Sequence, residues 1–155
     1  MNDSNQTFNA EKTHQLEATC RACGLSLTHQ RRALLEALVQ RKDHPTADQL
    51  FDDLKGQIKG LSRTTVYRTL ETFVRVGLVV KISSPQAKAR FDANTCRHHH
   101  INCVQCGEVA DLDVSGFDLP ELPESHPSGF QIYDYAIAFS GLCLRCQRGS
   151  NQSTQ

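Results

Sequence analysis

Four cysteines in the second half of the chain form two pairs with the same spacing. Two residues separate Cys103 from Cys106 and Cys143 from Cys146, and 36 residues lie between the two pairs. A two-residue gap lets a tight turn aim both thiolates at one ion, and two such pairs supply the ligands of tetrahedral zinc. We expect structural zinc here, because a second half of roughly seventy residues has little core of its own.

A second set of metal ligands lies directly before the first cysteine pair, in the run from His98 to His100. If this run is extended, side chains two residues apart share a face, so His98 and His100 point together while His99 points away. Two imidazoles on one face predict a metal site that is separate from the cysteine site.

A third pair with the same spacing, Cys20 and Cys23, lies in a predicted helix that runs from about Glu11 to Cys23 and ends at Gly24. Two helical residues three positions apart share one face. We interpret both as small side chains that face the core. The alternative is a redox or additional metal pair, which no nearby histidine supports.

Length and composition limit the classes of protein. The 155 residues fit one domain or two small ones, and seven cysteines without an apolar segment near Met1 favour a reducing cytoplasm. No apolar run has the length of a membrane span. Residues 1–82 hold 12 Lys/Arg and 9 Asp/Glu, a net charge of +3, while residues 83–155 hold 5 and 8, a net charge of −3. This asymmetry predicts a polyanion-facing first half and a cation-binding second half.

The first half has the pattern of a winged helix-turn-helix. After a polar N-terminal arm and the first helix, three more helices are predicted to begin at Thr28, Thr46 and Ser62, each a good N-cap. Alternating segments at 78–82 and 89–92, separated by a polar turn, then predict a hairpin. The expected buried positions of the three helices are Leu34, Leu35, Leu38, Val39, Leu50, Phe51, Leu54, Val66, Leu70, Phe73 and Val74.

The last of these helices has the residues of a recognition helix. Its apolar stripe leaves Arg63, Thr64, Tyr67 and Arg68 on the opposite face. Basic and hydroxyl side chains at the N-terminal end of such a helix reach phosphates and base edges. A solvated amphipathic helix has the same pattern, so this feature alone does not establish DNA binding.

The second half predicts a small α/β domain. Residues 108–113 and 130–139 alternate as strands do, and Pro120, Pro123 and Pro127 disfavour a long helix between them. With the histidine run, these segments form a three-stranded sheet that zinc closes at its end. The chain is therefore predicted to be α+β, with a winged-helix DNA-binding domain over residues 1–92 and an α/β domain over residues 93–155.

The ordered motifs between Leu16 and Cys146 resemble those of the ferric uptake regulator (Fur) family of metal-responsive repressors. The motifs are Leu27-Thr28-x-Gln30-Arg31, His44-Pro45-Thr46-Ala47, Ser62-Arg63-x-Thr65-Val66-Tyr67-Arg68, Gly77-Leu78-Val79, Arg90-Phe91-Asp92, the His-rich stretch into Cys103-x-x-Cys106-Gly107, and Gly141-Leu142-Cys143-x-x-Cys146. The resemblance implies a homodimer with a C-terminal dimerisation domain, which binds double-stranded operator DNA when its regulatory metal is bound.

The resemblance also implies a regulatory metal site at His44, Asp92, His98, His100 and Asp111. Three imidazoles and two carboxylates suit Fe²⁺, Mn²⁺ or Zn²⁺, while the lack of a thiolate disfavours a zinc-selective site. Without the resemblance, His44 would be interpreted as a solvated loop histidine.

Branches of the family differ at this site. Asp92 and Asp111 resemble the peroxide-sensing PerR type, because the iron-sensing type usually has Glu at both positions. The zinc-sensing type usually has Cys at the position of Ala93, and nearby Cys96 keeps zinc sensing open. A further family site is expected to be lost, because Arg and Tyr replace two of its ligands. Its positions here are Arg97, His99, Asp118 and Tyr135.

The sequence thus predicts a metal-dependent DNA-binding repressor with structural Zn²⁺ and regulatory Fe²⁺ or Mn²⁺. By the same resemblance, it is expected to sense hydrogen peroxide through iron-catalysed oxidation of a ligand histidine. A regulator of iron, manganese or zinc uptake is the alternative within the family. A non-heme iron or thiol redox enzyme is the alternative from another class, and we do not expect an enzyme because the sequence has no HExxH motif, nucleophile elbow or phosphate loop.

Overall fold

The chain is described by a computed structural model that covers residues 14, 17–84, 87–96, 98–118, 121, 128–132 and 137–150. It divides into two compact units, Met1–Cys96 and Arg97–Gln155. The boundary expected from the sequence, after Asp92, lies four residues earlier. Among the described residues, no helix combines the length and the apolar character needed to cross a membrane.

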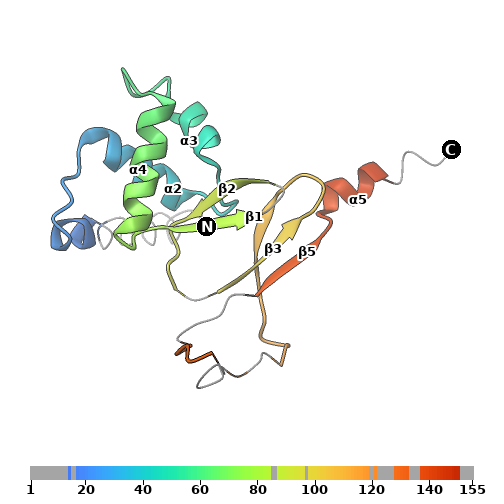
Figure 1. Cartoon of the computed structure of the whole chain (residues 1–155). Helices are drawn as coiled ribbons and strands as arrows, with labels where there is room; N and C mark the ends of the chain where they lie inside the picture. The colour runs from blue at the N-terminus through green and yellow to red at the C-terminus, as the bar shows by residue number, and fades with distance from the viewer. Residues whose placement is uncertain are drawn as a thin grey trace, which may run out of the picture. The chain divides into compact units, whose positions relative to one another are not determined.

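Three helices with side-chain caps form the body of the first unit (Figure 1). They are α2 (His29–Gln40), α3 (Ala47–Leu54) and α4 (Arg63–Arg75). Thr28 and Ser62 accept hydrogen bonds from backbone amides in the first turns of α2 and α4, and Thr46 forms a complete capping box with Gln49 before α3. These caps satisfy amides that a helix start leaves unpaired, so the three predicted starts are confirmed.

The segment before α2 ends as predicted at a left-handed glycine. Residues 17–22 are helical, and Gly24 has φ +67°. Leu25 N donates to Cys20 O and Gly24 N donates to Arg21 O, which are the two bonds of a Schellman motif. The predicted start near Glu11 lies outside the described residues. Cys20 is fully buried but Cys23 is exposed, so the core-facing interpretation is confirmed for Cys20 and wrong for Cys23.

The core of the first unit is built from the predicted helical stripes. Leu34, Leu50, Val66, Leu70 and Phe73 are each fully buried. Phe51 and Val74, also expected in the core, are only partly buried and pack against its edge. Burial of so many branched and aromatic side chains is the main stabilisation of this unit, because each contributes about 1.5–3 kcal/mol relative to exposure.

An antiparallel hairpin completes the winged helix. Gly77, with φ +73°, ends the turn after α4 and leads towards β1 (Val80–Ser84), which pairs with β2 (Ala87–Asp92). The first strand begins later than expected, and both strands extend further towards the turn, because backbone pairing continues where the side chains are polar. Residues 85–86 lie outside the described residues.

The second unit contains the predicted three-stranded sheet. Strand β3 (His99–Cys103) is central, with β4 (Val109–Leu112) antiparallel on one side and β5 (Ala138–Gly141) parallel on the other. The segment predicted over residues 130–139 contributes only its last two residues to β5, which then extends to Gly141. Residues 133–136 and the three prolines at 120, 123 and 127 lie outside the described residues.

A short helix that the sequence analysis missed follows the sheet. Helix α5 (Leu144–Ser150) has seven residues, and in Figure 1 it follows the end of β5. A segment this short has no apolar stripe that periodicity could reveal, and its only sequence signal was the cysteine spacing.

Leu70→Ala should destabilise the first unit by about 2–5 kcal/mol, because it removes a fully buried side chain and leaves a cavity beneath α4. Urea unfolding followed by circular dichroism would measure the loss. The matched control is Glu71→Ala, one position along the same helix, where only an exposed ion pair with Lys81 is lost. Equal effects of the two variants would mean that α4 does not bury the predicted face.

Candidate functional site

The four cysteines of the second unit converge at one end of its sheet. Cys103 ends β3, Cys106 lies in the following turn, Cys143 precedes α5 and Cys146 lies within it. Their ligand atoms all lie within 4.8 Å of one another, and the sulfurs of Cys106 and Cys143 are 3.7 Å apart. Zn–S bonds of about 2.3 Å give a tetrahedral edge of about 3.8 Å between sulfurs. The arrangement therefore has the dimensions of a four-thiolate site.

Backbone hydrogen bonds bring the two pairs together although 40 positions separate Cys103 from Cys143. Val104 N donates to Gly141 O at 2.9 Å, and Cys143 N donates to the sulfur of Cys103 at 3.4 Å. Gly107, with φ +69°, takes the left-handed conformation that closes the turn after Cys106. All seven cysteines of the chain lie among the described residues, and none of them forms a disulfide.

The electrostatic surroundings of the four thiols differ. The backbone amide of Cys143, followed by that of Cys106, donates to the Cys103 sulfur and lowers the pKa of this thiol to about 6. The amide of Glu108 and then the guanidinium of Arg145 lower the pKa of Cys106. Burial raises the pKa of Cys146 to about 12. Cys103 and Cys106 thus favour the thiolate form, which binds metal, even before an ion is bound. Cys146 requires a cation beside it to lose its proton.

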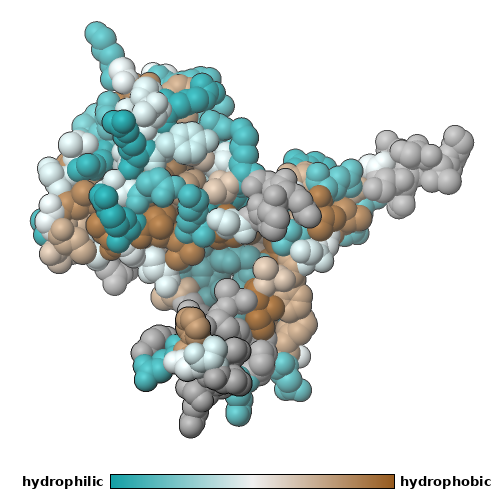
Figure 2. All heavy atoms as spheres, in the orientation of Figure 1, coloured by the Kyte–Doolittle hydropathy of each residue, from teal (hydrophilic) through white to brown (hydrophobic). Residues whose placement is uncertain are grey.

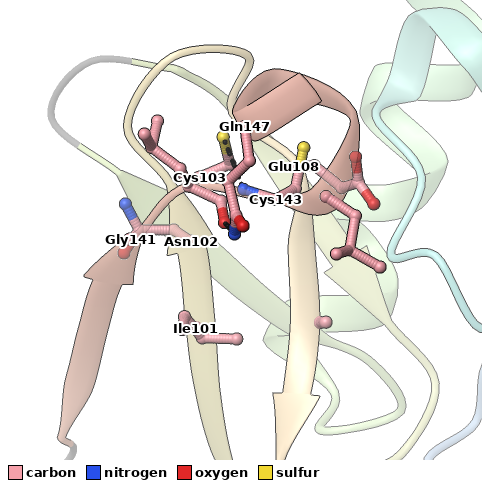
Figure 3. A pocket seen from close by; sticks show the side chains of 10 residues that line it. Ile101, Asn102, Cys103, Glu108, Gly141, Cys143 and Gln147 are labelled. Atoms are coloured by element: carbon pink, nitrogen blue, oxygen red, sulfur yellow. Dashed lines mark hydrogen bonds between the residues drawn. The ribbon is translucent and has the colours of Figure 1, made fainter. Parts of the chain in front are cut away.

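A pocket of about 250 Å³ lies against the cysteines, between the sheet and α5 (Figure 3). Figure 3 shows Cys103 and Cys143 near each other in its wall, with Gln147 on α5 and Glu108 directly before β4. The rest of the lining is largely apolar. Because the pocket shares two thiols with the cysteine cluster, it belongs to the same site.

A second cluster in this unit joins two histidines and a carboxylate. His100 lies opposite Asp111 in the antiparallel pairing of β3 and β4. Asp111 Oδ1 lies 3.3 Å from His98 Nε2 and 3.6 Å from His100 Nε2, and the two imidazole centroids are 4.4 Å apart. His99 is buried, with 5% of its surface exposed. The prediction that His98 and His100 point together is confirmed.

The other two predicted ligands meet inside the first unit. His44, in the loop between α2 and α3, places Nε2 3.5 Å from Oδ2 of Asp92 at the end of β2. Only 3% of the surface of His44 is exposed, so it is not a solvated loop histidine. Its backbone has φ +48°, a left-handed conformation that residues with a side chain seldom adopt. Each unit therefore contains an imidazole–carboxylate cluster of its own.

The four predicted DNA-contacting residues lie in the first half of α4 and are exposed. Figure 2 shows hydrophilic side chains over much of the visible surface of the first unit around this helix. Arg63 turns towards α3. Its guanidinium lies 4.4 Å from the ring centroid of Phe51, and its nitrogens lie 3.4 Å from Asp48 and 3.8 Å from Asp52. Arg63 is thus partly neutralised within the protein, a contact between helices that the sequence analysis missed.

The remaining candidates are placed only in part. Of the expected lost site, His99 is buried in β3 and Asp118 is exposed, while Arg97 and Tyr135 lie outside the described residues. Cys96, which left zinc sensing open, is exposed near the end of the first unit, and Ala93 is buried. The loss of that site and the role of Cys96 both stay predictions.

Comparison with known proteins identifies the family of this chain. Residues 22–140 match the ferric uptake regulator family. The peroxide operon regulator of Bacillus subtilis (strain 168) is 35% identical over 133 residues, which cover 86% of this chain and 92% of that protein. The peroxide-responsive repressor PerR of Staphylococcus aureus (strain Mu50) is 33% identical over 137 residues, covering 86% and 93%.

Solved structures show the same fold. The ferric uptake regulator Fur of Helicobacter pylori has a TM-score of 0.67 at 16% identity, covering 90% of this chain and 93% of that one. PerR from Streptococcus pyogenes has a TM-score of 0.51 at 23% identity, covering 87% and 92%. Because the family match spans most of the sequence and both relatives exceed 30% identity over nearly their full length, this chain belongs to the ferric uptake regulator family.

Proposed function

We propose that this chain is a metal-dependent DNA-binding transcriptional repressor that responds to hydrogen peroxide. The observation that carries the proposal is the pairing of His44 with Asp92 at 3.5 Å within the unit that contains the recognition helix. A metal bound by this pair acts directly on the DNA-binding unit. The relatives named as a peroxide operon regulator and a peroxide-responsive repressor support peroxide as the signal. The family is one of regulators, so the chain is not an enzyme.

The cysteine cluster is proposed to hold structural Zn²⁺ through Cys103, Cys106, Cys143 and Cys146. The sulfur spacing and the absence of disulfides among them support this assignment. The described part of the second unit has three short strands and one short helix, so its core is small. A closed four-thiolate site would contribute folding free energy directly and hold α5 against the sheet.

Cys103→Ser or Cys143→Ser should abolish zinc binding and, with it, the homodimer. Zinc content by atomic emission and mass by sedimentation would be measured on the same preparation. Cys23→Ser is the matched control, because Cys23 is exposed and lies in the other unit. A zinc-free Cys103→Ser protein that still sediments as a folded dimer would contradict the structural role.

The regulatory ion is proposed to be Fe²⁺ or Mn²⁺, held by imidazole and carboxylate ligands. The N–O separations within each cluster are 3.3–3.6 Å. They exceed a hydrogen bond of about 2.9 Å and approach the distance of about 3–3.4 Å between two ligands that share one ion. The proposed ligands are His44, Asp92, His98, His100 and Asp111.

His44 has a distinct role among these ligands, since its loop joins α2 to α3 in the DNA-binding unit. Ligation there would make the orientation of this unit depend on the metal, and metal would shift a population of orientations towards the one that fits DNA. Moving such an equilibrium from about 1:99 to 99:1 needs roughly 5.5 kcal/mol of differential affinity, which two sites in a dimer can supply together.

His44→Ala should leave zinc content and dimerisation intact while abolishing Mn²⁺-activated DNA binding, because one ligand from the DNA-binding unit is removed. Electrophoretic mobility shifts of promoter DNA with and without Mn²⁺ measure this. His14→Ala, at an exposed histidine of the same unit, should behave as the unchanged protein. Unchanged activation in His44→Ala would place the sensor elsewhere.

The partner is proposed to be double-stranded operator DNA, bound by a homodimer in the cytoplasm where such DNA lies. Thr64, Tyr67 and Arg68 are exposed near the start of α4, as groove contacts require. Arg63 is proposed as a contact as well, although its ion pairs with Asp48 and Asp52 must first exchange for phosphate. Its contribution should therefore be smaller than that of Arg68.

Arg68→Ala should weaken operator binding by about 1–3 kcal/mol if the guanidinium contacts a base. Fluorescence anisotropy with the Mn²⁺-loaded dimer at fixed salt measures the affinity. Arg75→Ala, at the opposite end of α4, removes the same charge away from the proposed interface. An Arg68→Ala protein that folds, binds metal and keeps full affinity would remove this helix from the interface.

The peroxide response is proposed to occur at the regulatory site. When held by these ligands, Fe²⁺ would supply the electron that splits hydrogen peroxide into hydroxide and a hydroxyl radical. The radical would add to an imidazole ring, and loss of a proton together with return of an electron to the iron would leave one oxygen on that ring. His44, His98 and His100 are the oxidisable side chains among the ligands, and a ligand ring that has gained an oxygen would no longer bind metal. Loss of the metal then releases the repressor from DNA. Mn²⁺ reduces peroxide much less readily, so the manganese form should repress but respond little.

A low dose of peroxide should add one oxygen to the peptide with His98 and His100, or to that with His44, in the Fe²⁺ form but not in the Mn²⁺ form. Peptide mass spectrometry measures this. Oxidation confined to Cys20, Cys23 or Cys96 would indicate a thiol sensor, and no oxidation with intact DNA binding would indicate a metal-uptake regulator. Consumption of peroxide well beyond one equivalent would indicate an enzyme.

A further inference from the structure

Arg90 links the loop that carries His44 to the strand that carries Asp92. Its Nη1 donates to the backbone carbonyl of His44 at 2.9 Å and lies 3.4 Å from that of Asp43. Arg90 precedes Asp92 by two positions in β2, so the two side chains leave the same face of the strand. The guanidinium and the proposed ligand carboxylate are thus directed to the same loop.

Backbone contacts fix the register of this loop on β2. Phe91 N donates to Pro45 O at 3.0 Å, and Thr46 forms an isolated antiparallel bridge with Arg90. These contacts hold the residues that follow His44, whereas the carbonyls of Asp43 and His44 are held by the Arg90 side chain. Arg90 therefore attaches the part of the loop at Asp43 and His44 to β2, while the backbone pairing attaches the part that follows His44.

A second arginine anchors the start of the loop to α3. The Arg41 guanidinium binds Asp43 in a fork, with Nε 2.8 Å from Oδ1 and Nη2 2.5 Å from Oδ2. Its Nη1 lies 2.5 Å from Asp53 in α3. Asp43 is therefore fixed through its side chain by Arg41 while its carbonyl approaches Arg90. Between these two attachments, His44 has little freedom of position.

His44 requires this support because its backbone is strained. With φ +48° it lies in the left-handed region, which costs free energy for any residue with a Cβ. A return to negative φ would rotate the imidazole away from Oδ2 of Asp92. The hydrogen bond from Arg90 to the His44 carbonyl opposes that rotation, because the carbonyl turns with the backbone.

We infer that Arg90 is a positioning residue for the regulatory metal, which holds the His44 backbone so that His44 Nε2 and Asp92 Oδ2 form a preassembled pair of ligands. The inference rests on the proposed function, since it requires that this pair binds metal. Arg90 itself is no ligand, and its positive charge by itself would oppose cation binding. The positioning effect must therefore outweigh the repulsion.

The test measures Mn²⁺ affinity of the zinc-loaded full-length dimer by calorimetry, together with the electron paramagnetic resonance spectrum of bound Mn²⁺. Arg90→Gln should weaken Mn²⁺ binding at least tenfold and alter the spectrum, as loss of an outer hydrogen bond to a ligand does. Arg90→Lys, which keeps a cationic donor, should recover part of the affinity. Arg75→Gln, at an exposed site of the same unit, removes an equal charge and should bind as the unchanged protein.

Thermal unfolding without Mn²⁺ separates positioning from general stability. If Arg90→Gln lowers the metal-free melting temperature but the folded protein binds Mn²⁺ with unchanged affinity and spectrum, Arg90 is only structural and the inference is overturned. Equal or tighter binding by Arg90→Gln would mean that repulsion dominates, which also overturns it. If Arg90→Gln fails to fold, the same measurements are made on Arg90→Lys. Unchanged Mn²⁺ affinity and an unchanged spectrum in that variant would overturn the inference.

His44→Ala, measured in parallel, separates this inference from the proposed function. If His44→Ala binds Mn²⁺ as tightly as the unchanged protein, the proposed site is wrong and the Arg90 inference falls with it. If His44→Ala loses Mn²⁺ while Arg90→Gln retains full affinity, only the Arg90 inference is overturned. A loss of affinity in both, with Arg75→Gln unchanged, is the expected result.

Discussion

The attachment of the α2–α3 loop to strand β2 is the contact on which the chemistry of the first unit depends. Without this attachment, the loop that carries His44 and the strand that carries Asp92 would not be held next to each other. The bond from Phe91 N to Pro45 O and the bridge between Thr46 and Arg90 bring them together. As a result, His44 and Asp92 meet although 48 positions separate them in the chain. The same contact holds the hairpin against the helices of the first unit, so it stabilises the fold and also brings the candidate ligands together.

Strand β3 has the corresponding role in the second unit, because it contributes residues to both clusters of candidate ligands. Its pairing with β4 sets His100 opposite Asp111, and its pairing with β5 sets Cys103 beside Gly141, two residues before Cys143. His100 and Cys103 lie three positions apart on this strand, a rise of about 10 Å. A loss of register at the cysteine end would therefore displace the histidine end, so zinc at the proposed cysteine site would also stabilise the geometry of the proposed regulatory ligands.

The ligand types separate the two proposed metals. Four cysteine thiolates favour zinc, whereas imidazole and carboxylate ligands favour iron or manganese. All four cysteines of the second unit belong to one cluster, so none of them is available as a ligand beside His98 and His100. The arginines of α4 also differ in their surroundings. Acidic residues of α3 partly neutralise Arg63, whereas Arg68, further along the helix, is exposed.

Local features were predictable from the sequence because their causes lie within a few residues. Thr28, Thr46 and Ser62 cap helices through amides three positions away, and Gly24 and Gly77 supply left-handed turns. The helical stripes identified most of the core, and alternation placed His98 and His100 on one face. The motif order identified the family, which added His44, Asp92 and Asp111 as candidate ligands where spacing alone offered no reason to choose them.

Tertiary structure decided what depends on contacts between distant segments. The burial and positive φ of His44, the hydrogen bond from Arg90 to its carbonyl, the approach of Arg63 to Asp48 and the exposure of Cys23 have no counterpart in local pattern. Helix α5 escaped periodicity, and alternation located β5 only in part, because the sheet and the cysteine cluster, rather than an apolar stripe, hold these segments in place. The sequence by itself determined which residues could bind metal and DNA, and long-range backbone pairing decided which of them meet.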